Sequence, residues 1–249
     1  MSFKFTLLTP SRYDLHSTFD VLVGSETFSL HTSVFTERSE FFRAARKPEW
    51  LAGNPKKLVD PEEDDTEVFS TYINCVYFGS EILKDLSDEW TSSPESDRVA
   101  KARTGLRSLL QIYLLADKLQ DLATANMVID ELVCFSDFVW QTPTQGDFSL
   151  VYRHTPQNSP LRKLMRDYFL HEQGASESVK WVKSLNHELI SDAMLEVLRI
   201  KRTDKHSTVD TALKRSAKSK TDKDKCHYHQ HDDKHPRCVP KPDAEPDTN

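Results

Sequence analysis

The sequence predicts an α+β protein: a short β-hairpin, a cluster of helices, a helical extension and a disordered tail. Three observations lead to this prediction. Apolar and polar side chains alternate on both sides of Gly24-Ser25, as in two antiparallel strands joined by a tight turn. Residues 66–79 and 102–133 repeat apolar side chains at the spacing of amphipathic helices. From residue 201 onward apolar residues almost vanish, and such a segment has too little apolar surface to fold.

The hairpin is expected over residues 19–31, with two short helices after it. Val21 and Val23 should share one face, because successive side chains of a strand point to opposite sides. Hydroxyl side chains favour helix N-caps, so Thr32-Ser33 and Ser39 are expected to start the two helices.

Residues 57–137 predict a short strand and then further helices. The strand is Lys57–Asp60, and the next helix begins at Asp64–Thr66 and ends at Gly79. Residues 80–100 are polar and rich in turn formers, so they predict a long surface loop inside the domain. Helix should resume near Ala102, and again after an N-cap at Asp121.

A helical extension is expected over residues 138–200. Residues 140–158 read as irregular because they contain two prolines. Ser159-Pro160 is a favourable helix start, since proline suits the first helical position. That helix should end at Gly174, and a second amphipathic helix is expected over 186–199. Residues 1–16 form an apolar, strand-like lead-in, and residues 201–249 form the disordered tail, interrupted by a Cys/His cluster at 226–238.

One set of positions follows a specific order along the chain. Its members are Asp20, Phe28, His31, Val34, Ser39, Phe42, Leu58, Asp60, Phe69, Tyr72, Tyr77 and Gly79, followed by Leu115–Leu119 and Ile129–Leu132. This order resembles the BTB/POZ domain over residues 17–137, and the whole chain is similar to fungal BTB-domain proteins. The resemblance implies the BTB/POZ fold, protein binding and homodimerisation. In some branches of the family it also implies service as a substrate adaptor of cullin-3 ubiquitin ligases.

Three polar residues of the domain are interpreted as fixing the fold. Asp20 is expected to be a buried, hydrogen-bonded carboxylate, His31 to fix the exit of the second strand, and Ser39 to cap a helix. In the transcription-factor branch of the family a basic residue commonly follows the histidine. Here Thr32 stands in that position, which weakens the link to that branch's co-repressor groove.

The tail carries a candidate metal site. Cys226, His229, His231 and Cys238 form the pattern C-x2-H-x-H-x6-C, and thiolate sulfur and imidazole nitrogen are the ligands that tetrahedral zinc prefers. His227 or His235 could replace either histidine. Two alternatives stay open: an unstructured histidine-rich tail and, in an oxidising setting, a disulfide between the two cysteines.

Charge and composition restrict the other function classes. The net charge of −6 argues against broad nucleic-acid binding. The sequence has no apolar run of membrane-spanning length and no signal-peptide pattern, so a cytoplasmic or nuclear location is expected. Cys75 and Cys134 are expected to be buried thiols. A Gly-x-Ser-x-Gly elbow and a glycine-rich phosphate loop are both absent from a chain with only 6 glycines, so an enzyme is not expected.

The leading hypothesis is a non-enzymatic protein-interaction module that acts as a homodimeric scaffold or adaptor. The alternatives are a cullin-3 substrate adaptor and a nuclear, transcription-linked regulator. The basic cluster at 214–220 supports the last of these, although it also reads as a solvated linker. The expected partners are a second copy of the chain and unidentified proteins. The dimer could form through the N-terminal strand or through a helical face.

Overall fold

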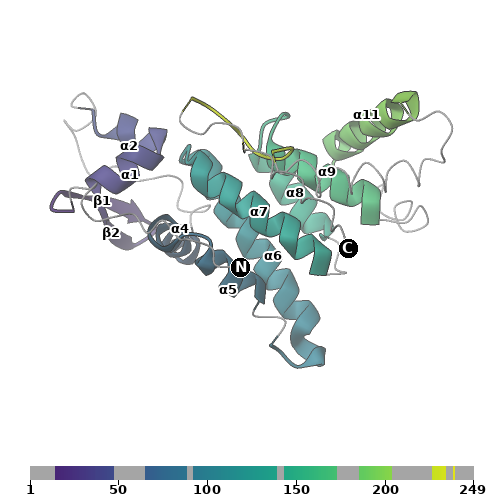
Figure 1. Ribbon diagram of the computed structural model, residues 1–249. Helices are drawn as coiled ribbons and strands as arrows, with labels where there is room; N and C mark the ends of the chain where they lie inside the picture. The colour runs from purple at the N-terminus through teal and green to yellow at the C-terminus, as the bar shows by residue number, and fades with distance from the viewer. Residues whose placement is uncertain are drawn as a thin grey trace, which may run out of the picture. The chain divides into compact units, whose positions relative to one another are not determined.

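The computed structural model describes residues 15–47, 65–88, 92–138, 143–172, 185–203, 226–233 and 238. Within these residues the chain is mixed α and β, mostly helical with one two-stranded sheet, which confirms the predicted α+β class (Figure 1). The chain divides into two compact units, Met1–Leu132 and Val133–Asn249. The predicted strand at 57–60, the helix end at Gly174 and most of the lead-in and tail lie outside the described residues.

The hairpin forms where the alternation predicts it. Strands β1 (Thr18–Val23) and β2 (Glu26–His31) are antiparallel, with Asp20 opposite Ser29 and Val21 opposite Phe28. Gly24 occupies the turn with φ +57°, a conformation that glycine adopts without steric cost. Val21, Val23 and Leu30 are buried, so one face of the hairpin belongs to the core of the first unit.

Two short helices follow the hairpin directly. Helix α1 (Thr32–Arg38) begins one or two residues earlier than the hydroxyl pattern suggests, with His31 at the N-cap and no side-chain cap bond. The prediction that Thr32-Ser33 would cap this helix was therefore wrong. Helix α2 (Glu40–Ala45) begins at Ser39, whose hydroxyl accepts a hydrogen bond from the Phe42 amide at 3.1 Å.

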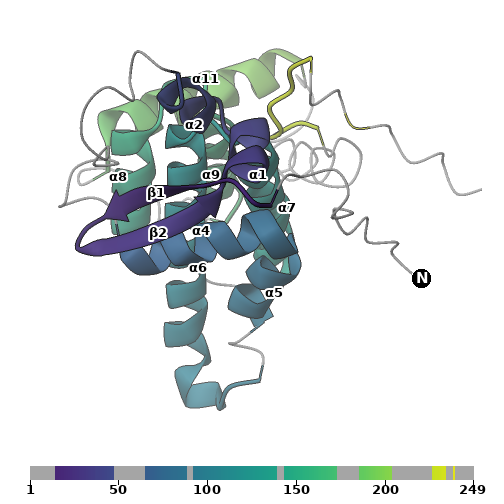
Figure 2. The ribbon, with the colours of Figure 1, turned by 90° about the vertical axis from the view of Figure 1, so that its left-hand side faces the viewer.

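Helix α4 (Thr66–Phe78) covers the hairpin from the other side. Its N-cap is Asp65 and it ends at Gly79, where φ is +80°. The Phe28 and Phe69 rings meet edge-on with centroids 5.0 Å apart, which joins β2 to α4. Figure 2 shows the hairpin between α1 and α4.

Three more helices are described in the first unit: α5 (Glu81–Asp88), α6 (Glu95–Lys118) and α7 (Leu122–Phe138), the last of which continues past the unit boundary. The predicted loop at 80–100 was therefore wrong over most of its length. Leu83 is fully buried, and its contacts stabilise α5 despite a polar sequence. Pro94 precedes α6, and Glu95 and Asp97 place negative charge in its first turn, where the helix dipole favours it.

The second unit contains α8 (Gln145–His154), α9 (Pro160–Glu172) and α11 (His187–Thr203). Helix α8 lies in the stretch predicted to be irregular. A capping box explains it, since Thr144 caps the Asp147 amide and the Asp147 carboxylate accepts from the Thr144 amide at 2.8 Å. Pro160 begins α9 as predicted. Helix α11 extends to Thr203, three residues into the expected tail.

Arg162 holds the helices of the second unit together. Its side chain is 6% exposed and donates to the Thr155 hydroxyl at 3.0 Å, to the Tyr152 carbonyl at 2.6 Å and to the Glu188 carboxylate. The guanidinium also lies 4.7 Å from the centroid of the Tyr152 ring. It therefore satisfies carbonyls at the end of α8 while linking α9 to α11.

Among the described residues, no helix has the combination of length and apolar character needed to cross a bilayer.

Candidate metal centre

The three polar residues singled out in the domain occupy different environments. Asp20 is exposed, so its expected burial was wrong. Strand alternation turns Val21 and Val23 inward and therefore turns Asp20 outward. Its carboxylate accepts a hydrogen bond from the Ser29 hydroxyl at 2.6 Å, across the hairpin.

His31 lies at the end of β2 and contacts α4. Its Nδ1 atom is 2.7 Å from the Tyr77 hydroxyl, and the two rings meet edge-on at 5.8 Å. Burial raises the pKa of Tyr77 above its ordinary value. The described hydrogen bonds of Asp20 and His31 therefore go to different partners, Ser29 and Tyr77.

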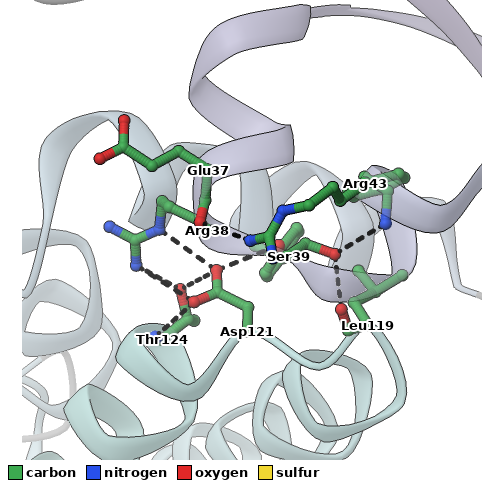
Figure 3. A network of polar contacts seen from close by, with 9 residues as sticks. Glu37, Arg38, Ser39, Arg43, Leu119, Asp121 and Thr124 are labelled. Carbon is green, nitrogen blue, oxygen red and sulfur yellow. Dashed lines mark hydrogen bonds and ion pairs between the residues drawn. The ribbon is translucent and has the colours of Figure 1, made fainter. Parts of the chain in front are cut away.

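Ser39 is fully buried where α1 meets α2. Besides capping α2, its hydroxyl donates to the Leu119 carbonyl at 2.5 Å (Figure 3). Arg43 donates to the Thr36 and Glu37 carbonyls at 3.0 and 3.2 Å and so closes the end of α1. These bonds attach the pair of short helices to the turn between α6 and α7.

Asp121 forms the centre of this network, a role that its sequence position as an N-cap did not reveal. The carboxylate is fully buried and caps α7 by accepting from the Thr124 amide at 3.0 Å. It accepts from Arg38 Nε at 3.3 Å (Figure 3). It also accepts from the Tyr72 hydroxyl at 3.1 Å. Burial, and then the nearby Asp121 charge, raise the pKa of Tyr72 well above its ordinary value. The polar side chains of this network hydrogen-bond to one another, so the network holds the helices together.

The structure brings together the predicted metal ligands of the second unit. Ligand atoms of Cys226, His231 and Cys238 all lie within 4.8 Å of one another. Ligand atoms around one tetrahedral zinc ion are about 3.3–3.8 Å apart, given bond lengths of about 2.0–2.3 Å. These three side chains could therefore hold a metal ion with little adjustment.

His229, the fourth predicted ligand, lies beside this group. Its Nδ1 atom is 3.2 Å from Cys238 Sγ. The local backbone supports the arrangement, because the His229 amide donates to the Cys226 carbonyl at 3.1 Å and closes a turn. The Cys238 amide also donates to Cys226 Sγ at 3.0 Å.

The structure describes one of the two histidines that could replace a predicted ligand, His227, and it does not describe the other. His227 is outside the three-residue group, and its ring packs edge-on against Tyr228 with centroids 4.6 Å apart. His235 lies outside the described residues. Cys226 and Cys238 are not joined by a disulfide. The described geometry therefore favours the predicted set over its substitutes.

Tyr228 fastens this cluster to the helices of the second unit. The side chain is buried, with 4% of the residue exposed, and its hydroxyl donates to Asp167 Oδ2 on α9 at 2.8 Å. Asp167 also pairs with Arg166 at 2.8 Å. Burial, and then the Asp167 charge, raise the pKa of Tyr228. Sequence reasoning missed this contact, although Tyr228 is the only aromatic residue after position 200 and so carried a signal.

The chemistry of the donor set points to a structural metal. Cys226, His231 and Cys238 supply three donors, and with His229 as a fourth they would fill all four positions of a tetrahedral ion and leave none for substrate. A metal held this way stabilises the surrounding chain rather than activating water.

Comparison with known proteins adds nothing to this geometry: no protein family, no curated protein and no solved structure matches the chain.

Proposed function

We propose that this chain is a non-enzymatic protein-interaction module of the BTB/POZ kind that acts as a homodimeric scaffold. The observation that carries the proposal is the order of elements in the first unit. A hairpin runs straight into two short helices, and α4 then closes over the hairpin. This is the order that the resemblance of residues 17–137 implies. The buried polar side chains described there hold elements together, as Ser39 and Asp121 do.

The second unit adds a zinc-binding knuckle to the scaffold. We infer zinc because two sulfur and two nitrogen donors match its preferred tetrahedral set. Tyr228 and Asp167 then connect the bound metal to α9. The knuckle is thus a structural element of the helical extension.

The scaffold proposal is tested by multi-angle light scattering of the full chain at 5–50 μM, concentrations of the order at which specific homodimers with affinities near 1 μM are populated. The expected result is twice the chain mass of 28.7 kDa. A monomer throughout this range contradicts the proposal.

A cullin-3 adaptor is a second candidate, supported by the helices that follow the first unit, α8, α9 and α11. A scaffold needs no ligase, whereas an adaptor must bind one. Pull-down of purified cullin-3 by the full chain is the test. Binding no stronger than that of an unrelated helical protein removes this candidate and leaves the scaffold standing.

A further inference from the structure

Helix α11 has two faces of different character. Residues 189, 193, 196 and 200 are buried against the second unit, and the spacing of four, three and four residues is that of one helix face. The opposite face carries Met194, Leu195 and Leu198, which are 58%, 61% and 58% exposed. Figure 1 shows α11 packed along α9, so the outer face is a distinct surface of the unit.

This concentration of exposed apolar side chains is unusual within the described part of the chain. Six large apolar residues are more than 40% exposed there, and three of them are these neighbours on α11. Single exposed apolar residues need no explanation, but adjacent ones at helical spacing mark contact surfaces. We call Met194, Leu195 and Leu198 the α11 patch.

The charged residues beside the α11 patch indicate which partner would bind it. Glu188 lies seven residues before Leu195 and Arg202 seven residues after it, and both are exposed. Seven residues are two helical turns, so all three residues lie on the same side of the helix. In an antiparallel second copy crossing at Leu195, each Glu188 faces the partner's basic end and each α11 patch covers the other. The two helix dipoles also oppose one another favourably.

We propose that α11 is a homodimer surface on which a second copy of this chain packs antiparallel, with the two-fold axis at Leu195. The inference rests on the proposed scaffold function, because it names the surface through which two copies meet. An isologous two-fold contact needs such self-complementarity, whereas an unrelated partner would not require acid and base at equal distances from the apolar centre. Glu188 already accepts from Arg162, and a carboxylate has room for a second donor.

The first test is sedimentation velocity of the zinc-loaded full chain, comparing wild type with Leu195→Glu/Leu198→Glu. Both side chains are exposed, so the substitutions should leave the fold intact by circular dichroism. We expect the double variant to weaken dimerisation at least tenfold, while Val99→Glu leaves it unchanged. Val99 is the matched control because it is an exposed apolar residue on α6, 42% accessible.

The second test fixes the orientation, in a background in which exposed Cys134 is Ser. Leu195→Cys places two thiols at the axis and should be cross-linked by a short bismaleimide. Ser191→Cys lies one turn away on each copy, so the two thiols are separated by about 12 Å along the axis and should react poorly. Equal cross-linking at both positions indicates a parallel pair and overturns the antiparallel arrangement.

The outcomes separate this inference from the scaffold proposal. A wild-type dimer that persists in Leu195→Glu/Leu198→Glu overturns the α11 surface and leaves the scaffold standing. A wild-type monomer overturns both. Loss of the dimer in the double variant, with Val99→Glu unaffected, supports both.

Discussion

The Asp121 carboxylate joins three helices of the first unit. It caps α7, pairs with Arg38 of α1 and accepts from Tyr72 of α4. A buried carboxylate is tolerated only when its charge is paired and its oxygens accept hydrogen bonds. Asp121 meets both conditions, which is why a charged residue can stand at the centre of this packing.

Replacing Asp121 by Asn tests this role. Asparagine keeps the size and can still cap α7, but it removes the charge that pairs with Arg38. We expect the free energy of unfolding to fall by about 2 kcal/mol, below the full cost of breaking a buried pair because the Arg38 side chain is 18% exposed. Urea denaturation measures it. Asp20→Asn is the matched control, since that carboxylate is exposed; equal losses in both variants would refute the assignment.

Cys75 of α4 and Cys134 of α7 should react with thiol reagents at different rates. Burial raises the pKa of the Cys75 thiol to about 12, so almost none of it is thiolate at neutral pH. Cys134 is exposed, which corrects the expectation that it would be buried. We expect a thiol reagent to label Cys134 in the native protein and Cys75 only after unfolding, as mass spectrometry of labelled peptides can show. Rapid native labelling of Cys75 would contradict its position.

At the scale of elements, the second unit depends on side chains that connect helix ends. Arg162 links α8, α9 and α11, and Tyr228 links the metal cluster to α9. Neither side chain makes these bonds within its own segment; each bonds to residues of another element. Each acts at a single position, so the loss of one side chain should release a whole element.

Tyr228→Phe should loosen the cluster from α9. The variant loses the 2.8 Å bond to Asp167, worth about 2 kcal/mol because the acceptor is a carboxylate, while keeping the buried ring. We expect faster hydrogen exchange over residues 226–233 and an unchanged metal content, because Tyr228 is not a ligand. Tyr228→Ala, which also removes the ring, should show a larger effect. Exchange that is the same in all three proteins would show that Tyr228 does not anchor the segment.

Particular elements show what could be read from the sequence. The hairpin, the caps at Ser39 and Asp65 and the start of α9 at Pro160 follow from local chemistry, and local chemistry is visible in sequence. Helices α5 and α8 were missed because polar residues and prolines outweighed weaker signals. Leu83 gains its burial from tertiary contacts, and the Thr144–Asp147 capping box was present but overlooked.

The candidate metal site also has a part that the sequence predicted and a part that it did not. Ligand type and spacing predicted which side chains could hold a metal, because a short segment can bring them together without help from the rest of the fold. The anchor at Asp167 could not be predicted, since it lies 61 residues from Tyr228 in sequence. Asp20 was misjudged because being polar and within a strand does not say which face it occupies.

The whole molecule consists of two compact units, and we propose that the first binds protein and that the second carries a metal knuckle. The first unit supplies its own core, from Phe35 and Phe42 to Tyr113. In the second unit, the three helices share a core that includes Phe148 and Leu189. The metal would add stability by fixing residues 226–238, whose sequence has few apolar side chains of its own.

The most direct test of this account is native mass spectrometry of the full chain, purified without added metal and washed with a weak chelator. We predict one zinc ion per chain, lost in Cys226→Ser/Cys238→Ser and retained in Cys134→Ser. A wild-type protein without zinc, or zinc content unchanged by the double substitution, would contradict the metal centre.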